Sequence, residues 1–153
     1  METKFEIVPV PTRILTHHDD IVEAIVEYGG DKIGPDDVVC VAESVVAITQ
    51  GGAKRSEDFK PGLLAKVLCR LFPSKGSISG WHSMQALIDA EGGMRVLIAV
   101  ICGFAAKCVG VSGVFYRMAG EQARLSDDVT GTMPPYDKHI VYGPHNPSKV
   151  AEE

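Results

Sequence analysis

Residues 37–52 constrain the fold more than any other part of the chain, because they combine a strand pattern, a helix pattern and a glycine stop. Residues 37–42, Asp-Val-Val-Cys-Val-Ala, are mostly β-forming and show no polar alternation. Such a run predicts a central strand that is covered on both faces. Residues 43–50 predict a short helix, and Gly51 and Gly52 are suited to end it. We therefore expect residues 37–42 to form the centre of a sheet.

The rest of the chain alternates helix patterns with short strand patterns. Apolar spacing and glycine or proline stops predict further helices over residues 21–28, 61–72, 81–90, 94–108 and 148–153. Further strands are predicted over residues 5–10, 113–118 and 139–142. No glycine-rich phosphate loop and no dinucleotide fingerprint is present, so neither a P-loop nor a Rossmann fold is expected. We predict one mixed α+β domain over residues 1–153.

Composition and charge exclude several kinds of partner. Acidic residues outnumber basic residues by 20 to 15, and the formal net charge is -5, so nucleic acid is not expected to bind. The most apolar stretch, residues 94–109, contains two charges and is too short to cross a membrane, which takes about 20 residues. The first residues show no secretory signal pattern, so we expect a cytoplasmic protein. The four cysteines lack CxxC spacing and predict reduced thiols packed in the core.

A long irregular segment, residues 119–137, carries the candidate metal ligands. A loop of this length in a small domain is usually functional. Asp127 and Asp128 are adjacent carboxylates, the oxygen ligands that Mg²⁺ and Mn²⁺ prefer, although a solvated turn would have the same sequence. Asp137 follows a double proline and could supply a further oxygen, or it could only cap the next turn.

The end of the helix over 43–50 and two arginines are candidates for substrate binding. Four residues of this helix and its stop could present a hydroxyl, an amide and backbone N–H groups to an anion: Ser44, Gln50, Gly51 and Gly52. The alternative is that the glycines only terminate a helix. Arg13 and Arg117 could each pair with a substrate carboxylate, or could be ordinary surface arginines.

Four segments resemble the coenzyme F(420) γ-glutamyl ligase family, and together they cover nearly the whole chain: residues 11–22, 36–51, 115–120 and 132–137. The segment 36–51 is similar to the family's buried strand followed by a short, glycine-ended helix. The Gly-rich apolar helix before residues 113–116 is similar to the bacterial branch of the family. The resemblance implies a ligase-type domain in which Tyr116 contacts nucleotide or substrate.

Characterised members of that family join L-glutamate to a deazaflavin precursor through a γ-linked amide, using GTP and a divalent metal. The implied chemistry is phosphoryl transfer to a carboxylate, followed by attack of an amine on the acyl phosphate. The resemblance also implies GTP and Mg²⁺ or Mn²⁺ as cofactors and a homodimer as the assembly. Ser44 and Gly52 stand where relatives commonly carry basic residues, and Gln122 stands where ligases carry a metal-liganding Asp.

The resemblance leaves two functions open. Family chains continue beyond the equivalent of Glu153, so we expect this chain to lack the family's C-terminal segment. If the chain is catalytic, it is a GTP- or ATP-dependent carboxylate–amine ligase, completed by a dimer partner or by a second polypeptide as one half of a split enzyme. The alternative is a non-catalytic ligand-binding or assembly module that retains the fold.

Overall fold

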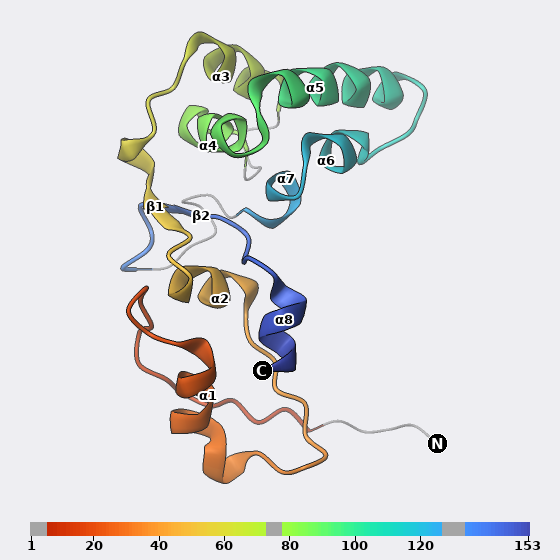
Figure 1. The fold of residues 1–153 in the computed structure, drawn as a ribbon. Coiled ribbons are helices and arrows are strands. Elements are labelled where there is room, and N and C mark those ends of the chain that lie inside the picture. Colours follow the sequence, from red (N-terminus) through yellow and green to blue (C-terminus); the bar gives the residue numbers. More distant parts are fainter. Residues whose placement is uncertain (1–5, 73–77, 127–133) are drawn as a thin grey trace.

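The structure is a computed structural model that describes residues 6–72, 78–126 and 134–153. The described residues are mainly helical, with one small sheet (Figure 1). The α-helices are α1 (Ile21–Gly29), α2 (Glu43–Thr49), α3 (Leu63–Leu68), α4 (Trp81–Glu91), α5 (Gly93–Cys108), α6 (Val114–Ala119), α7 (Gln122–Leu125) and α8 (Pro147–Glu152). Short 3-10 helices are η1 (Gly30–Lys32), η2 (Ser56–Asp58) and η3 (Cys69–Leu71). The strands are β1 (Ala53–Arg55) and β2 (His139–Val141).

The sheet joins two groups of helices. Strands β1 and β2 are antiparallel, with Ala53 opposite Val141 and Arg55 opposite His139. Above the sheet in Figure 1 lie α3 to α7, here called the upper body, and below it lie α1, α2 and α8, here called the lower body. Because β1 follows α2 and β2 precedes α8, this pairing ties the two ends of the lower body together.

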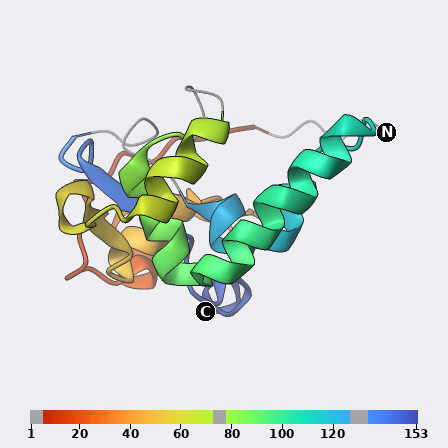
Figure 2. The same ribbon diagram turned by 90° about the horizontal axis from the view of Figure 1, so that it is seen from above.

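The upper body contains the largest apolar core. Met84, Val96 and Ala99 are fully buried between α4 and α5, and Phe115 and Ala119 of α6 pack against them. Figure 2 shows α5 as the longest helix, running outward with α6 beside it. Gly103 allows the close approach of these two helices, because a Cβ there would lie 2.9 Å from Cβ of Phe115.

The lower body has its own smaller core. Leu15, Ile21 and Ala24 pack against Val46 of α2, and Val150 of α8 covers them. Helix α1 begins at Asp20, whose carboxylate accepts hydrogen bonds from the N–H groups of the second and third helical residues at 2.8 and 3.1 Å. This is the usual arrangement for a helix that starts with an acidic cap.

All six predicted helices are present, and α4 and α5 are separated by the predicted glycine stop. The mixed fold class is correct at this level, although the described residues are mostly helical. Residues 139–142 were predicted as a strand and contain β2, whereas β1 was not predicted.

The strand predictions over 113–118 and 37–42 are wrong, and the strand prediction over 5–10 finds no support. Residues 113–118 are not a strand: Gly113, with φ of 80°, precedes helix α6. The β-forming side chains there adopt a helix because Phe115 and Ala119, one turn apart, both reach the core on α5. Residues 37–42 pair with no other strand in the described ranges, and neither do residues 6–10 of the strand predicted over 5–10.

The segment 37–42 is extended but lies at the surface instead of at a sheet centre. Val38 is 82% exposed, and Val39 and Val41 are exposed as well. Backbone groups of residues 38–41 make no hydrogen bonds with the described part of the chain. The four cysteines are free, as predicted, but two of them are not packed in the core: Cys40 is exposed in this segment, and Cys108 is exposed at the end of α5.

Candidate functional site

The glycine turn after α2 is used to terminate the helix. The N–H of Gly51 donates to the carbonyl of Ile48 at 2.9 Å, and the N–H of Gly52 donates to the carbonyl of Ala47 at 2.7 Å. Gly51 has φ of 78°, and a Cβ on Gly52 would lie 2.8 Å from the Ala47 oxygen. Both positions therefore favour glycine, and both N–H groups are already bonded within the turn.

Gln50 connects α2 to the segment that precedes α8. Its Nε2 donates to the carbonyl of His145 at 3.0 Å, and its Oε1 accepts from the N–H of His145 at 2.6 Å. The side-chain amide thus pairs with a backbone 95 residues away in sequence, as a neighbouring strand would. We call this pair of hydrogen bonds the Gln50 clamp.

Ser44 lies at the other end of α2. The helix rises about 1.5 Å per residue, which separates Ser44 from Gln50 by roughly 9 Å along the axis. The half-buried Ser44 hydroxyl makes no hydrogen bond within the described residues. Unlike the Gln50 amide and the two glycine N–H groups, it is therefore not already bonded within the chain. A substrate that contacts both side chains has to span the length of this helix.

Arg13 forms a two-pronged ion pair within its own loop. Its guanidinium donates to the two carboxylate oxygens of Asp19 at 2.5 and 3.0 Å. The same carboxylate accepts from the N–H of Thr16 at 2.6 Å. These donors hold the pKa of Asp19 well below its usual value, and the Asp19 carboxylate raises the pKa of Arg13. A substrate carboxylate would have to displace Asp19 to reach Arg13.

The turn that follows the double proline returns to α2. The side chain of Tyr136 packs against the buried cluster of Ala47, Ile48 and Val141, and its hydroxyl donates to the carbonyl of Leu15 at 3.1 Å. Burial raises the pKa of this phenol. Asp137 follows at the surface. The structure therefore brings the Arg13 loop, the glycine turn after α2 and the Asp137 turn into one neighbourhood.

Tyr116 and Arg117 lie elsewhere. Both are on α6, which packs along α5 in the upper body and away from α2 (Figures 1 and 2). Both side chains are exposed, and Arg117 has no ion-pair partner in the ranges that the structure describes. Asp127 and Asp128, the predicted metal ligands, lie outside the described residues.

Gln122 has a structural role that the sequence does not reveal. Its Oε1 accepts from the N–H of Gly143 at 2.8 Å, and its own N–H donates to the Glu91 carboxylate at 2.8 Å. Glu91 also accepts from Arg95 at 2.9 Å. These contacts link α4, α7 and the segment after β2. At the position where the resemblance places a metal-liganding Asp, this chain has an amide that holds the backbone.

His139 is a candidate that sequence reasoning did not single out. Its ring lies 5.3 Å from the ring of Tyr136. Its Nδ1 is buried and has no hydrogen-bond partner within the described residues. A buried polar atom without a hydrogen-bond partner is uncommon in native structures, and a functional role is one explanation for it. No sequence pattern could have found it, because its burial depends on the pairing of β2 with β1.

The described residues contain no group of three or more His, Cys, Asp or Glu side chains that could hold a metal ion. No helix within these ranges is both long and apolar enough to cross a bilayer.

The family model described as F(420)-0:gamma-glutamyl ligase matches residues 9–153, so the chain belongs to this family of ligases. No curated protein and no solved structure is significantly similar to the chain.

Proposed function

We propose that this chain takes part in nucleotide- and metal-dependent γ-glutamyl amide ligation in the cytoplasm. The observation that carries the proposal is the family match over residues 9–153. The geometry is consistent with it, since the glycine turn after α2, the Arg13 loop and the Asp137 turn lie together although they are far apart in sequence. Binding sites commonly form where such loops meet.

The described residues do not by themselves fit a metal or a nucleotide phosphate. The N–H groups of Gly51 and Gly52 are bonded within the turn, Arg13 is paired with Asp19, and the described ranges hold no metal-ligand cluster. The proposal therefore assigns the metal to Asp127 and Asp128, or to groups from another chain. GTP and Mg²⁺ or Mn²⁺ are the cofactors that the family implies.

The proposal includes a partner chain, which is either a second copy in a homodimer or a separate C-terminal chain. Residues 38–41 expose apolar side chains and backbone groups that have no partner in the described ranges, and Ile7 is 90% exposed. An extended segment of this kind is suited to pair with an incoming strand. Such pairing would also cover residues 37–42, whose β-forming composition predicts a buried strand.

Calorimetric titration with GTP and Mn²⁺ tests this function. The proposal expects saturable heat that requires both ligands. Asp127→Asn and Asp128→Asn should remove the Mn²⁺ requirement for GTP binding or abolish binding, whereas Asp36→Asn, the same charge change at an exposed turn, should leave it intact. The absence of heat at millimolar ligand, with or without the partner chain, would contradict the proposal.

A second candidate function is a non-catalytic ligand-binding or assembly module. The engagement of Arg13, Gln50 and both glycine N–H groups within the chain favours it, because these groups then stabilise the fold and do not face a ligand. This candidate predicts partner binding through residues 38–41 without GTP binding. Sedimentation of the chain with and without GTP distinguishes the two functions.

A further inference from the structure

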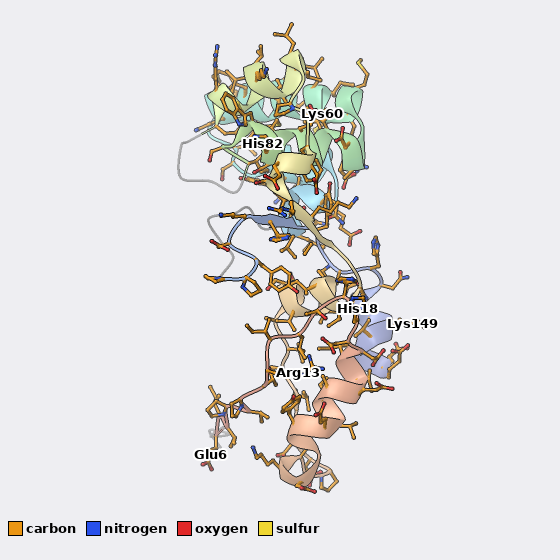
Figure 3. The ribbon with its side chains drawn as sticks, turned by 90° about the vertical axis from the view of Figure 1, so that its left-hand side faces the viewer. Glu6, Arg13, His18, Lys60, His82 and Lys149 are labelled. Atoms are coloured by element: carbon orange, nitrogen blue, oxygen red, sulfur yellow. The ribbon has the colours of Figure 1, made fainter. Side chains whose placement is uncertain are left out.

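A pocket in the upper body is separate from the neighbourhood of α2. It lies between the end of α3, η3 and the start of α4, and its volume is about 420 Å³. Small-molecule sites usually range from about 300 to 1,000 Å³. Figure 3 shows His82, one of its lining residues, in the upper body and Arg13 well below it. We call this cavity the α3–α4 pocket.

The α3–α4 pocket is positively charged in a chain that is negatively charged overall. Lys66 and Arg70 line it from positions four residues apart, and neither has an ion-pair partner among the described residues. None of the lining residues is acidic. Glu57, which follows the lining residue Ser56, is paired with Arg55 at 2.7 Å and directed to that partner. Two like charges one turn apart repel each other, and an anion placed between them would relieve this repulsion.

Trp81 forms an apolar wall of the same pocket. It is 55% exposed, although a tryptophan side chain is usually well buried in a folded protein. Its ring meets the ring of His82 edge-on, with centroids 6.0 Å apart. An exposed indole beside unpaired cations can contact the organic part of a ligand while the cations contact its anionic part.

His82 is held in place for a polar contact. Its Nδ1 lies 3.1 Å from the carbonyl oxygen of Phe59, and a carbonyl can only accept, so Nδ1 carries the proton. This contact fixes the orientation of the imidazole ring beside the pocket.

We propose that the α3–α4 pocket binds a small phosphorylated compound. The phosphate oxygens contact Lys66 and Arg70, and the organic part lies against Trp81. The planar guanidinium of Arg70 matches a phosphate with two parallel hydrogen bonds, and Lys66 supplies a point charge. This site goes beyond the proposed ligase function, because none of the residues assigned to ligation lines it.

Trp81 is the chain's single tryptophan, so its fluorescence reports on this pocket alone. The experiment titrates the whole protein with inorganic pyrophosphate and with phenyl phosphate, without GTP or metal, against sodium chloride of equal ionic strength. We expect a saturable change with both phosphates and none with chloride. Phenyl phosphate should give the larger spectral shift, because its ring contacts the indole.

Three variants make the test specific. Arg70→Gln and Lys66→Gln should each weaken binding about tenfold or more, as expected for loss of a charge-assisted contact. Lys107→Gln, the same change at the exposed end of α5, should bind like the original chain. A linear response equal to that of chloride would overturn the proposal. Equal weakening by all three variants would also overturn it, because binding would then depend on net charge and not on the pocket.

Discussion

Replacing Gln50 by alanine removes the Gln50 clamp, which joins α2 to the segment before α8. The side chain makes two neutral hydrogen bonds, at 3.0 and 2.6 Å, to the backbone of His145. Each such bond contributes about 0.5–1.5 kcal/mol net, and Gln50 is exposed, so the lower part of that range applies. The expected loss of stability is about 1–2 kcal/mol, or roughly 3–6 °C in melting temperature for a chain of this size.

Thermal and urea unfolding measure this loss, and hydrogen exchange locates it. The amide of His145 donates to Gln50, so it should exchange faster in Gln50→Ala. Gln50→Glu keeps an oxygen acceptor but loses the Nε2 donor, and it should fall between the other two proteins. Glu27→Ala on the exposed side of α1 is the control and should change stability by less than about 0.5 kcal/mol. If Gln50→Ala unfolds like the original chain and His145 exchanges at the original rate, the clamp does not form in solution.

Three further predictions concern single residues. Gly120→Ala should cost roughly 3 kcal/mol or more in urea unfolding, because Gly120 has φ of 120° and a Cβ there would lie 2.0 Å from Oε2 of Glu91; a smaller loss would mean that Glu91 can move aside freely. Asp19→Asn should remove stability above about pH 4 and change little well below it, because Arg13 lowers the pKa of Asp19 in the folded chain and the benefit is lost as the carboxylate is protonated; equal losses at all pH values would contradict this. Burial raises the pKa of Tyr142 to about 12, so stability should decline as the pH rises from about 10 towards 12, and Tyr142→Phe should lessen that decline; an absorbance titration that loses a tyrosine of ordinary pKa in this variant would refute the assignment.

Apolar spacing and stop residues located six of the eight α-helices in the described residues, but α6 was predicted as a strand and α7 was not predicted. The helix predicted over 94–108 begins one residue later than α5 (Gly93–Cys108). The boundary between α4 and α5 could be located because it lies at Gly92, which has φ of 88°. Residues 139–142 were predicted as a strand, and β2 lies within them because Ile140 and Val141 are buried there. These signals are local, so they can be read from neighbouring residues.

Features that depend on distant partners could not be predicted. Residues 37–42 have the composition of a buried strand, but a strand is buried only if another strand and a covering layer are available. The segment 53–55, Ala-Lys-Arg, has little β-forming tendency and becomes β1 by pairing with β2. For the same reason, no pattern in the sequence shows that Gln50 bonds to His145 or that Gln122 bonds to Gly143.

The glycine turn after α2 and the Asp137 turn lie in one neighbourhood, because Tyr136 packs against the cluster of Ala47, Ile48 and Val141. A shared binding site there stays a prediction. Tyr116 and Arg117 were predicted to lie on a strand over residues 113–118, whereas they lie on helix α6 in the upper body. A substrate-binding role for these residues remains a prediction from the resemblance.

Coupled turnover tests the proposed ligation most directly. The protein is incubated with GTP, Mn²⁺, L-glutamate and a deazaflavin acceptor that carries a carboxylate, both alone and with the candidate C-terminal chain, and GDP and the amide product are quantified by mass spectrometry. We predict that GDP forms only when glutamate and acceptor are both present, with one GDP for each new amide bond. Failure to form both GDP and amide in either mixture would contradict ligation by this chain.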